Sequence, residues 1–154
     1  MTRGKWEDMH DIRHLVGVRA APEDVYRALA TIDGLAGWWT EQTSGSAEAG
    51  GTIDFRFPNG AFAMKVVDQV PGRSVRWTVI DGPEEWVGTE IRWDLRQEDD
   101  FTKLVFTHAG WREPVEFMHH CSTKWAVYIL SLKQLVETGT GAPSPHDPKI
   151  DSWD

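Results

Sequence analysis

Residues 115–138, VEFMHHCSTKWAVYILSLKQLVET, form the longest helix-like pattern in the chain and decide its fold. Apolar side chains recur there at alternating spacings of three and four, which on a helical period of about 3.6 residues gathers them into one stripe. Pro114 suits a first helical turn, and Gly139 suits the left-handed residue that ends a helix. We therefore predict one amphipathic helix that buries this stripe against the rest of the domain. The stripe consists of Met118, Cys121, Trp125, Tyr128, Leu132 and Leu135.

The chain before this helix has the pattern of an antiparallel sheet. A first alternating strand is predicted at residues 11–19, and two short helices follow it, at 22–32 and 35–39. The segment 43–51 is rich in Gly, Ser and Ala and is predicted to be a loop. Strands that precede a helix, rather than alternating with helices, indicate an α+β domain with a curved sheet wrapped around the long helix. Five further strands are predicted at 52–57, 62–70, 75–79, 89–96 and 104–110.

Composition and charge exclude several classes of partner. The net charge of −8 and the pI of about 5.2 argue against a nucleic-acid surface or an anionic membrane, both of which attract clusters of Lys and Arg. No stretch approaches the roughly 20 apolar residues of a membrane span, and the first residues have no apolar leader pattern, so we expect a cytoplasmic protein. The one cysteine, Cys121, rules out an internal disulfide and is expected to be an inert core residue.

The aromatic content is unusual, with nine Trp, six Phe and two Tyr. An ordinary globular chain carries several-fold less tryptophan. Such large rings fill a core too wide for small aliphatic side chains, or they form the flat apolar walls of a cavity. Both interpretations are open from composition alone.

Four segments resemble the AHSA1-type branch (activator of Hsp90 ATPase homologue) of the SRPBCC superfamily, which is START/Bet v 1-like. They are VGVRAAPEDVYRAL at 16–29, GLAGWW at 34–39, LVFTHAGW at 104–111 and WAVYILSLKQLVETGTG at 125–141. The resemblance covers residues 11–145 and implies one domain over that range, with an arm at 1–10 and a tail at 146–154. It implies a helix-grip fold, in which a curved antiparallel sheet of six or seven strands, two small helices and a long helix enclose a cavity.

The resemblance leaves three functions open, because fold does not settle function. The first is binding of a small apolar or aromatic molecule between the sheet and the long helix, without a cofactor. The second is a cofactor-free enzyme of cyclase or dehydratase type. The third is a protein-interaction module that contacts the chaperone Hsp90, as the activator does.

Nine residues are candidates for the cavity wall, because the pattern places them on inward faces. His14 and His108 lie on the apolar sides of their strands, where an imidazole can transfer protons or can simply be a hydrogen-bonded core residue. The tryptophans among the candidates are likewise either cavity walls or packed core. The candidates are His14, Trp39, Phe55, Trp77, Trp93, Phe106, His108, Met118 and Trp125.

Two further features of the long helix concern metals and self-association. His119 and His120 are adjacent, but neighbouring helical residues diverge by about 100°, so only Glu116 shares a face with His120. Zinc takes three or four ligands, so we predict a solvated surface and no metal. Val127 and Leu130 fall outside the apolar stripe and are candidates for a homodimer contact or for the docking site of the tail.

Overall fold

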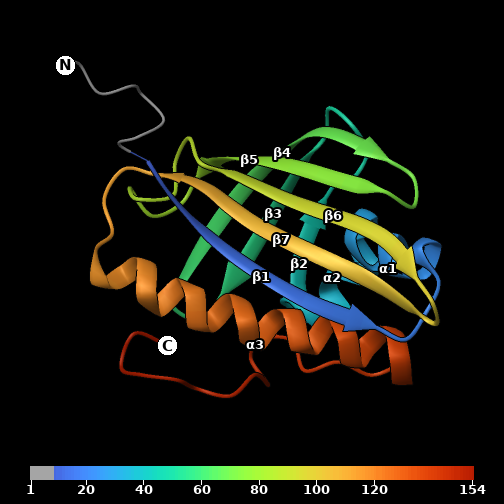
Figure 1. The fold of residues 1–154 in the computed structure, drawn as a ribbon. Helices are drawn as coiled ribbons and strands as arrows, with labels where there is room; N and C mark the ends of the chain where they lie inside the picture. Colours follow the sequence, from blue (N-terminus) through green and yellow to red (C-terminus); the bar gives the residue numbers. More distant parts are fainter. Residues whose placement is uncertain (1–8) are drawn as a thin grey trace.

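The computed structural model describes residues 9–154, which form a seven-stranded antiparallel sheet and three helices (Figure 1). Apart from the last two residues, the predicted arm at 1–10 lies outside the described part of the chain. No helix in the described part is long and apolar enough to span a membrane. The elements are β1 (His10–Val18), α1 (Pro22–Ala30), α2 (Ile32–Trp38), β2 (Gln42–Gly45), β3 (Thr52–Phe57), β4 (Gly60–Val70), β5 (Ser74–Asp81), β6 (Glu90–Glu98), β7 (Phe101–Trp111) and α3 (Glu116–Thr138).

The sheet order is β1-β7-β6-β5-β4-β3-β2, so the strands from β2 to β7 form one continuous meander and β1 pairs beside β7. Helix α3 lies across one face of the sheet, and α1 and α2 cover the same side near one end (Figure 1). This arrangement confirms the predicted α+β helix-grip fold.

The predicted loop at 43–51 is partly wrong, because β2 begins at Gln42, extends into this range as far as Gly45 and pairs with β3. Thr43 lies opposite Phe55, and Gly45, at a φ of 104°, lies opposite Ile53. The strand is short, polar and mostly exposed at the edge of the sheet. It therefore lacks the alternation of apolar residues from which the other strands were predicted.

Helix α3 confirms the predicted long helix. Gly139 ends it at a φ of 92°, and its N–H donates to the carbonyl of Leu135. The buried residues of α3 include Met118, Cys121 and Trp125 from the predicted stripe. Because the helix lies across the sheet, this stripe meets the inward faces of the strands.

The chain after α3, residues 139–154, turns back and runs along the helix (Figure 1). Gly141 passes between α2 and α3 so closely that a Cβ there would lie 2.4 Å from the carbonyl oxygen of Gly37. Two backbone hydrogen bonds then hold Ser144, one to the Trp39 carbonyl at 2.8 Å and one from the Glu41 N–H at 3.1 Å. These contacts direct the rest of the segment, which we call the tail segment (residues 145–154), toward the first half of α3.

Candidate functional site

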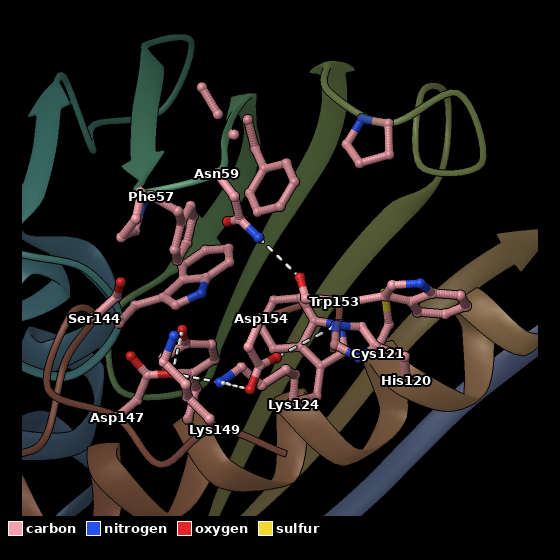
Figure 2. Close-up of a pocket in the computed structure, with 18 of the residues that line it drawn as sticks. Phe57, Asn59, His120, Cys121, Lys124, Ser144, Asp147, Lys149, Trp153 and Asp154 are labelled. Atoms are coloured by element: carbon pink, nitrogen blue, oxygen red, sulfur yellow. Dashed lines mark hydrogen bonds and ion pairs between the residues drawn. The ribbon is translucent and has the colours of Figure 1, made fainter. Parts of the chain in front are cut away.

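A pocket of about 710 Å³ opens between the tail segment, α3, the β3–β4 hairpin and the β5–β6 loop (Figure 2). Its apolar walls come from the sheet side and from α3, and its polar groups come mainly from α3 and the tail segment. The residues that line it are Trp39, Phe57, Pro58, Asn59, Gly60, Ala61, Phe62, Pro83, Trp86, Phe117, His120, Cys121, Lys124, Trp125, Tyr128, Ser144, Pro145, Asp147, Lys149, Trp153 and Asp154.

Flat aromatic rings form the inner walls. Phe62 on β4 stacks on Trp86 from the β5–β6 loop, with ring centroids 4.4 Å apart and an angle of 17°. Trp86 in turn stacks near Trp125 of α3 at 5.7 Å, and Trp125 meets Trp39 at 5.0 Å. Such rings offer large apolar contact areas with little conformational freedom to lose. The walls therefore suit a flat apolar or aromatic ligand.

A chain of hydrogen bonds behind these walls positions two of the tryptophans. The indole N–H of Trp125 donates to His108 Nδ1 at 3.1 Å, which leaves the proton of the neutral ring on Nε2. Nε2 lies 2.8 Å from Thr89 Oγ1, and the hydroxyl of Thr89 donates to the carbonyl of Trp86 at 2.6 Å. His108 thus connects Trp125 on the helix to the loop that carries Trp86.

His108 itself is fully buried and does not border the pocket. Burial lowers its pKa from 6.5 to about 3, so the imidazole is neutral at pH 7. Both ring nitrogens already have partners, which is the arrangement of a structural core histidine. His14, the other candidate, links β1 to α3, because its Nε2 lies 3.0 Å from the carbonyl of Ser122.

The structure places the other seven predicted cavity residues in two groups. Trp39 and Trp125 border the pocket. The other five do not border it, and instead lie in the hydrophobic core, where Trp93 contacts Phe106 at 4.8 Å and Trp77 at 5.8 Å between ring centroids. These five are Phe55, Trp77, Trp93, Phe106 and Met118.

Several lining residues were not among the candidates because they lie outside regular alternation. Trp86 is in the β5–β6 loop, and Pro58 and Asn59 are in the turn of the β3–β4 hairpin. A period-two pattern predicts the faces of a strand but not the direction of loop residues. Only the residue type could have indicated that Trp86 is buried, since a tryptophan in a turn-rich segment seldom faces only water.

A polar cluster lies where α3 meets the tail segment (Figure 2). Lys124 Nζ hydrogen-bonds to Asp147 Oδ2, and it lies 3.1 Å from Asp154 Oδ2. The hydroxyl of Tyr128 donates to Asp147 at 3.1 Å. Burial, and then the charge of Asp147, raises the pKa of Tyr128 well above its usual value, so the phenol remains a donor.

His120 completes this cluster one turn from Lys124. Its Nδ1 lies 2.6 Å from Asp151 Oδ2, and its Nε2 lies 3.8 Å from Asp154 Oδ1. The hydrogen bond from His120 lowers the pKa of Asp151. His120, Asp151 and Asp154 offer ligand atoms within 4.8 Å of one another. However, the two ring nitrogens face different carboxylates, and Lys124 already binds one of them, which is the geometry of an ion-pair network rather than of ligands converging on a metal.

Cys121 also borders the pocket. Its Sγ accepts a hydrogen bond from the indole N–H of Trp86 at 3.4 Å. Burial raises the pKa of the thiol to about 12, so it stays protonated and unreactive at neutral pH. Its role in the structure is to orient Trp86.

A curved antiparallel sheet, a long helix across it and a pocket between them define a helix-grip domain. Residues 19–137 match the model of the family described as Activator of Hsp90 ATPase homolog 1-like protein. The chain therefore belongs to this family. No curated protein matches the sequence.

Solved structures agree with this assignment. The Aha1 dimer from Colwellia psychrerythraea is 45% identical, with a TM-score of 0.80 over 86% of this chain and 99% of that chain. The protein SSP2350 from Staphylococcus saprophyticus is 18% identical, with a TM-score of 0.72 over 86% of this chain and 95% of that chain. EF2215 from Enterococcus faecalis, a conserved protein of unknown function, is 23% identical, with a TM-score of 0.71 over 94% of this chain and 78% of that chain. The last two likenesses concern the fold alone.

Proposed function

We propose that the protein binds a small apolar or aromatic molecule in the pocket between α3 and the sheet. The observation that carries this proposal is the ring-walled space of about 710 Å³ beside Trp39, Trp86 and Trp125. Pockets that bind small molecules in proteins have volumes of roughly 300 to 1,000 Å³ and are mostly apolar with a few polar groups. Lys124, Tyr128 and Asn59 supply such groups at the border of this pocket.

The test is a fluorescence titration with N-phenyl-1-naphthylamine, an uncharged aromatic probe whose emission rises in apolar surroundings. Binding should saturate at one probe per chain and should raise the melting temperature, since a ligand at 100 times its dissociation constant stabilises the folded state by about 2.7 kcal/mol. The absence of both effects would contradict the proposal.

A matched pair of variants locates the binding. Phe62 borders the pocket, whereas Phe101, which is also half-buried, lies on β7 and contacts Arg19 and Lys133 instead. Losing an aromatic wall removes both buried apolar area and ring stacking, together worth about 1.5 kcal/mol or more. Phe62→Ala should therefore weaken the probe at least tenfold, and Phe101→Ala should leave its affinity unchanged. Equal effects of the two variants would show that the probe binds elsewhere.

The geometry gives less support to the cyclase or dehydratase alternative. A general acid or base must lie within hydrogen-bond reach of the reacting proton. Neither His108 nor His14 borders the pocket, and both are hydrogen-bonded to other groups. The one imidazole that borders the pocket, His120, contacts carboxylates of the tail segment.

Contact with a chaperone is a second candidate function, favoured by the 45% identity with a protein named Aha1. This function would use the outer surface of the domain and would not require the pocket. A pull-down with Hsp90 from the same host tests it, and association at micromolar concentration is the expected result. If no complex forms, this candidate is removed while the pocket proposal stands.

Self-association through α3 is proposed for the same reason, since that 45% identical protein is described as a dimer. Leu130 is 57% exposed on α3, and Val127 beside it is half-buried. Sedimentation should give the mass of a dimer for the native chain and of a monomer for Leu130→Glu. A native chain that sediments as a monomer at high concentration would contradict this proposal.

A further inference from the structure

Two basic side chains of α3 border the aromatic pocket at its polar end. The side chain of Lys124 is 14% exposed and that of His120 is 10% exposed. A buried ammonium loses much of its hydration, so it requires an anionic partner close by. The polar end of the pocket is thus built to receive an anion beside aromatic rings.

The tail segment supplies that anion from the chain itself. The side chain of Asp154 is 5% exposed, and its Oδ2 lies 3.1 Å from Lys124 Nζ. Its Oδ1 is buried without a hydrogen-bond partner among the described residues, and faces His120 Nε2 at 3.8 Å. The neighbouring Trp153 places its ring 5.4 Å from that of His120 and 5.8 Å from that of Phe117. Two adjacent residues therefore present a carboxylate and an aromatic ring to the pocket.

The tail segment is attached in a way that permits exchange. Its fixed end is held by backbone hydrogen bonds between Ser144 and both Trp39 and Glu41. Beyond Ser144, the contacts with α3 and the β3–β4 turn all use side chains, such as Lys124 with Asp147 and Asn59 Nδ2 with the carbonyl of Trp153 at 2.8 Å. Trp153 remains 48% exposed, and the segment lies beyond residues 19–137 that match the family. Such an end can leave the pocket while the anchor at Ser144 stays in place.

From this arrangement we infer that the preferred ligand is an aromatic anion, and that the tail segment occupies its anionic subsite until the ligand displaces it. This inference rests on the proposed binding function and specifies the ligand class. Lys124 and His120 would pair with the anionic group, and the rings of Trp86 and Trp125 would contact the aromatic part. The carboxylates of Asp147 and Asp154 act as internal competitors that lower the affinity for the anion.

The experiment compares two fluorescent probes that share one ring system. 1-Anilinonaphthalene-8-sulfonate carries an anionic group, and N-phenyl-1-naphthylamine lacks it. In the full chain, Asp147→Asn with Asp154→Asn removes two carboxylates beside Lys124 with little change of shape. Asp68→Asn with Asp100→Asn removes the same net charge at exposed positions outside the pocket lining, and is the matched control.

The variant with Asp147→Asn and Asp154→Asn, which we call the tail variant, should bind the anionic probe at least tenfold more tightly than the native chain. Its affinity for the uncharged probe should be within twofold of the native affinity. Adding Lys124→Met to the tail variant should remove the gain, and the control variant should show none. The inference is overturned if the tail and control variants gain equal affinity for the anionic probe, or if the tail variant gains equal affinity for both probes. In either case the proposed binding function stands. If neither probe binds any form of the chain, both proposals fall.

Discussion

Two tryptophans of the core differ from two of the pocket wall in how their indole N–H groups are used. Trp77 and Trp93 are fully buried, and their indole nitrogens have no hydrogen-bond partner among the described residues. At the pocket, Trp86 donates to Cys121 and Trp125 donates to His108. These two core rings are therefore held by packing alone, whereas these two wall rings are also held by directed bonds. Burial by itself does not decide this, because Trp38 is equally buried in the core and its indole N–H donates to the carbonyl of Ala28 at 2.8 Å.

This difference has a physical reason. An unpaired buried N–H costs about 1 to 3 kcal/mol, but a tryptophan packed on all sides recovers this through the roughly 150 to 250 Å² that it buries. A ring at a pocket lacks packing contacts on one side, so shape alone fixes its orientation less well. Hydrogen bonds at the rear of Trp86 and Trp125 replace those missing contacts and preserve a flat wall.

The largest expected effect is the loss of a core ring. Trp93 is fully buried and contacts Trp38, Trp77 and Phe106. Trp93→Ala should lower the free energy of unfolding by about 3 to 5 kcal/mol, measured by urea denaturation, because the deleted ring leaves a cavity among packed neighbours. Trp153→Ala, at a residue that is 48% exposed, is the control and should cost under about 1 kcal/mol. A small cost at Trp93 would show that the core is loosely packed.

A smaller effect should appear on acidification through His108. Its pKa is about 3 in the folded state and near 6.5 in the unfolded state, so below pH 6.5 the unfolded chain takes up a proton that the folded chain does not. The contribution of His108 to the free energy of unfolding should therefore be constant well above pH 6.5, and should fall by about 2 kcal/mol between pH 7 and pH 5. Urea denaturation at several pH values across this range should show that the free energy of unfolding depends less steeply on pH in His108→Gln than in the native chain. The same slope in both proteins would mean that His108 titrates normally in the fold.

The smallest effect separates hydrogen bonding from packing directly. Trp77→Phe and Trp125→Phe remove similar ring area, but only the second removes a hydrogen bond, the one to His108 Nδ1. Trp125→Phe should cost about 1 to 2 kcal/mol more than Trp77→Phe, because a buried acceptor loses its partner. Equal costs in denaturant unfolding would show that the bond does not stabilise the wall.

The sequence predicted those parts of the fold that have a regular period. The stripe of α3 and the alternation in β1 and β3 to β7 gave the sheet and the helix that covers it, whereas β2 has no apolar alternation and was missed. Trp39 and Trp125 were expected in a cavity wall and border the pocket, while Trp77 and Trp93 face inward in the same way but pack in the core. Periodicity predicts which face is buried, but not where a buried space remains.

The polar end of the pocket could not be predicted, because it depends on contacts between segments far apart in sequence. His120 appeared as an exposed residue paired at most with Glu116 on its own helix. In the structure its partners are Asp151 and Asp154, which reach it only because the tail segment turns back along α3. No local pattern in residues 145–154 signals that turn.

We propose above that the ring-walled space beside Trp86 and Trp125 binds small aromatic molecules. The most direct test follows the indole N–H resonances of ¹⁵N-labelled protein by NMR during titration with N-phenyl-1-naphthylamine, with assignments from single Trp→Phe variants. We expect the signals of Trp39, Trp86 and Trp125 to shift with one common dissociation constant, and those of Trp77 and Trp93 to move much less. Shifts confined to Trp77 and Trp93, or no shifts at saturating probe, would contradict it.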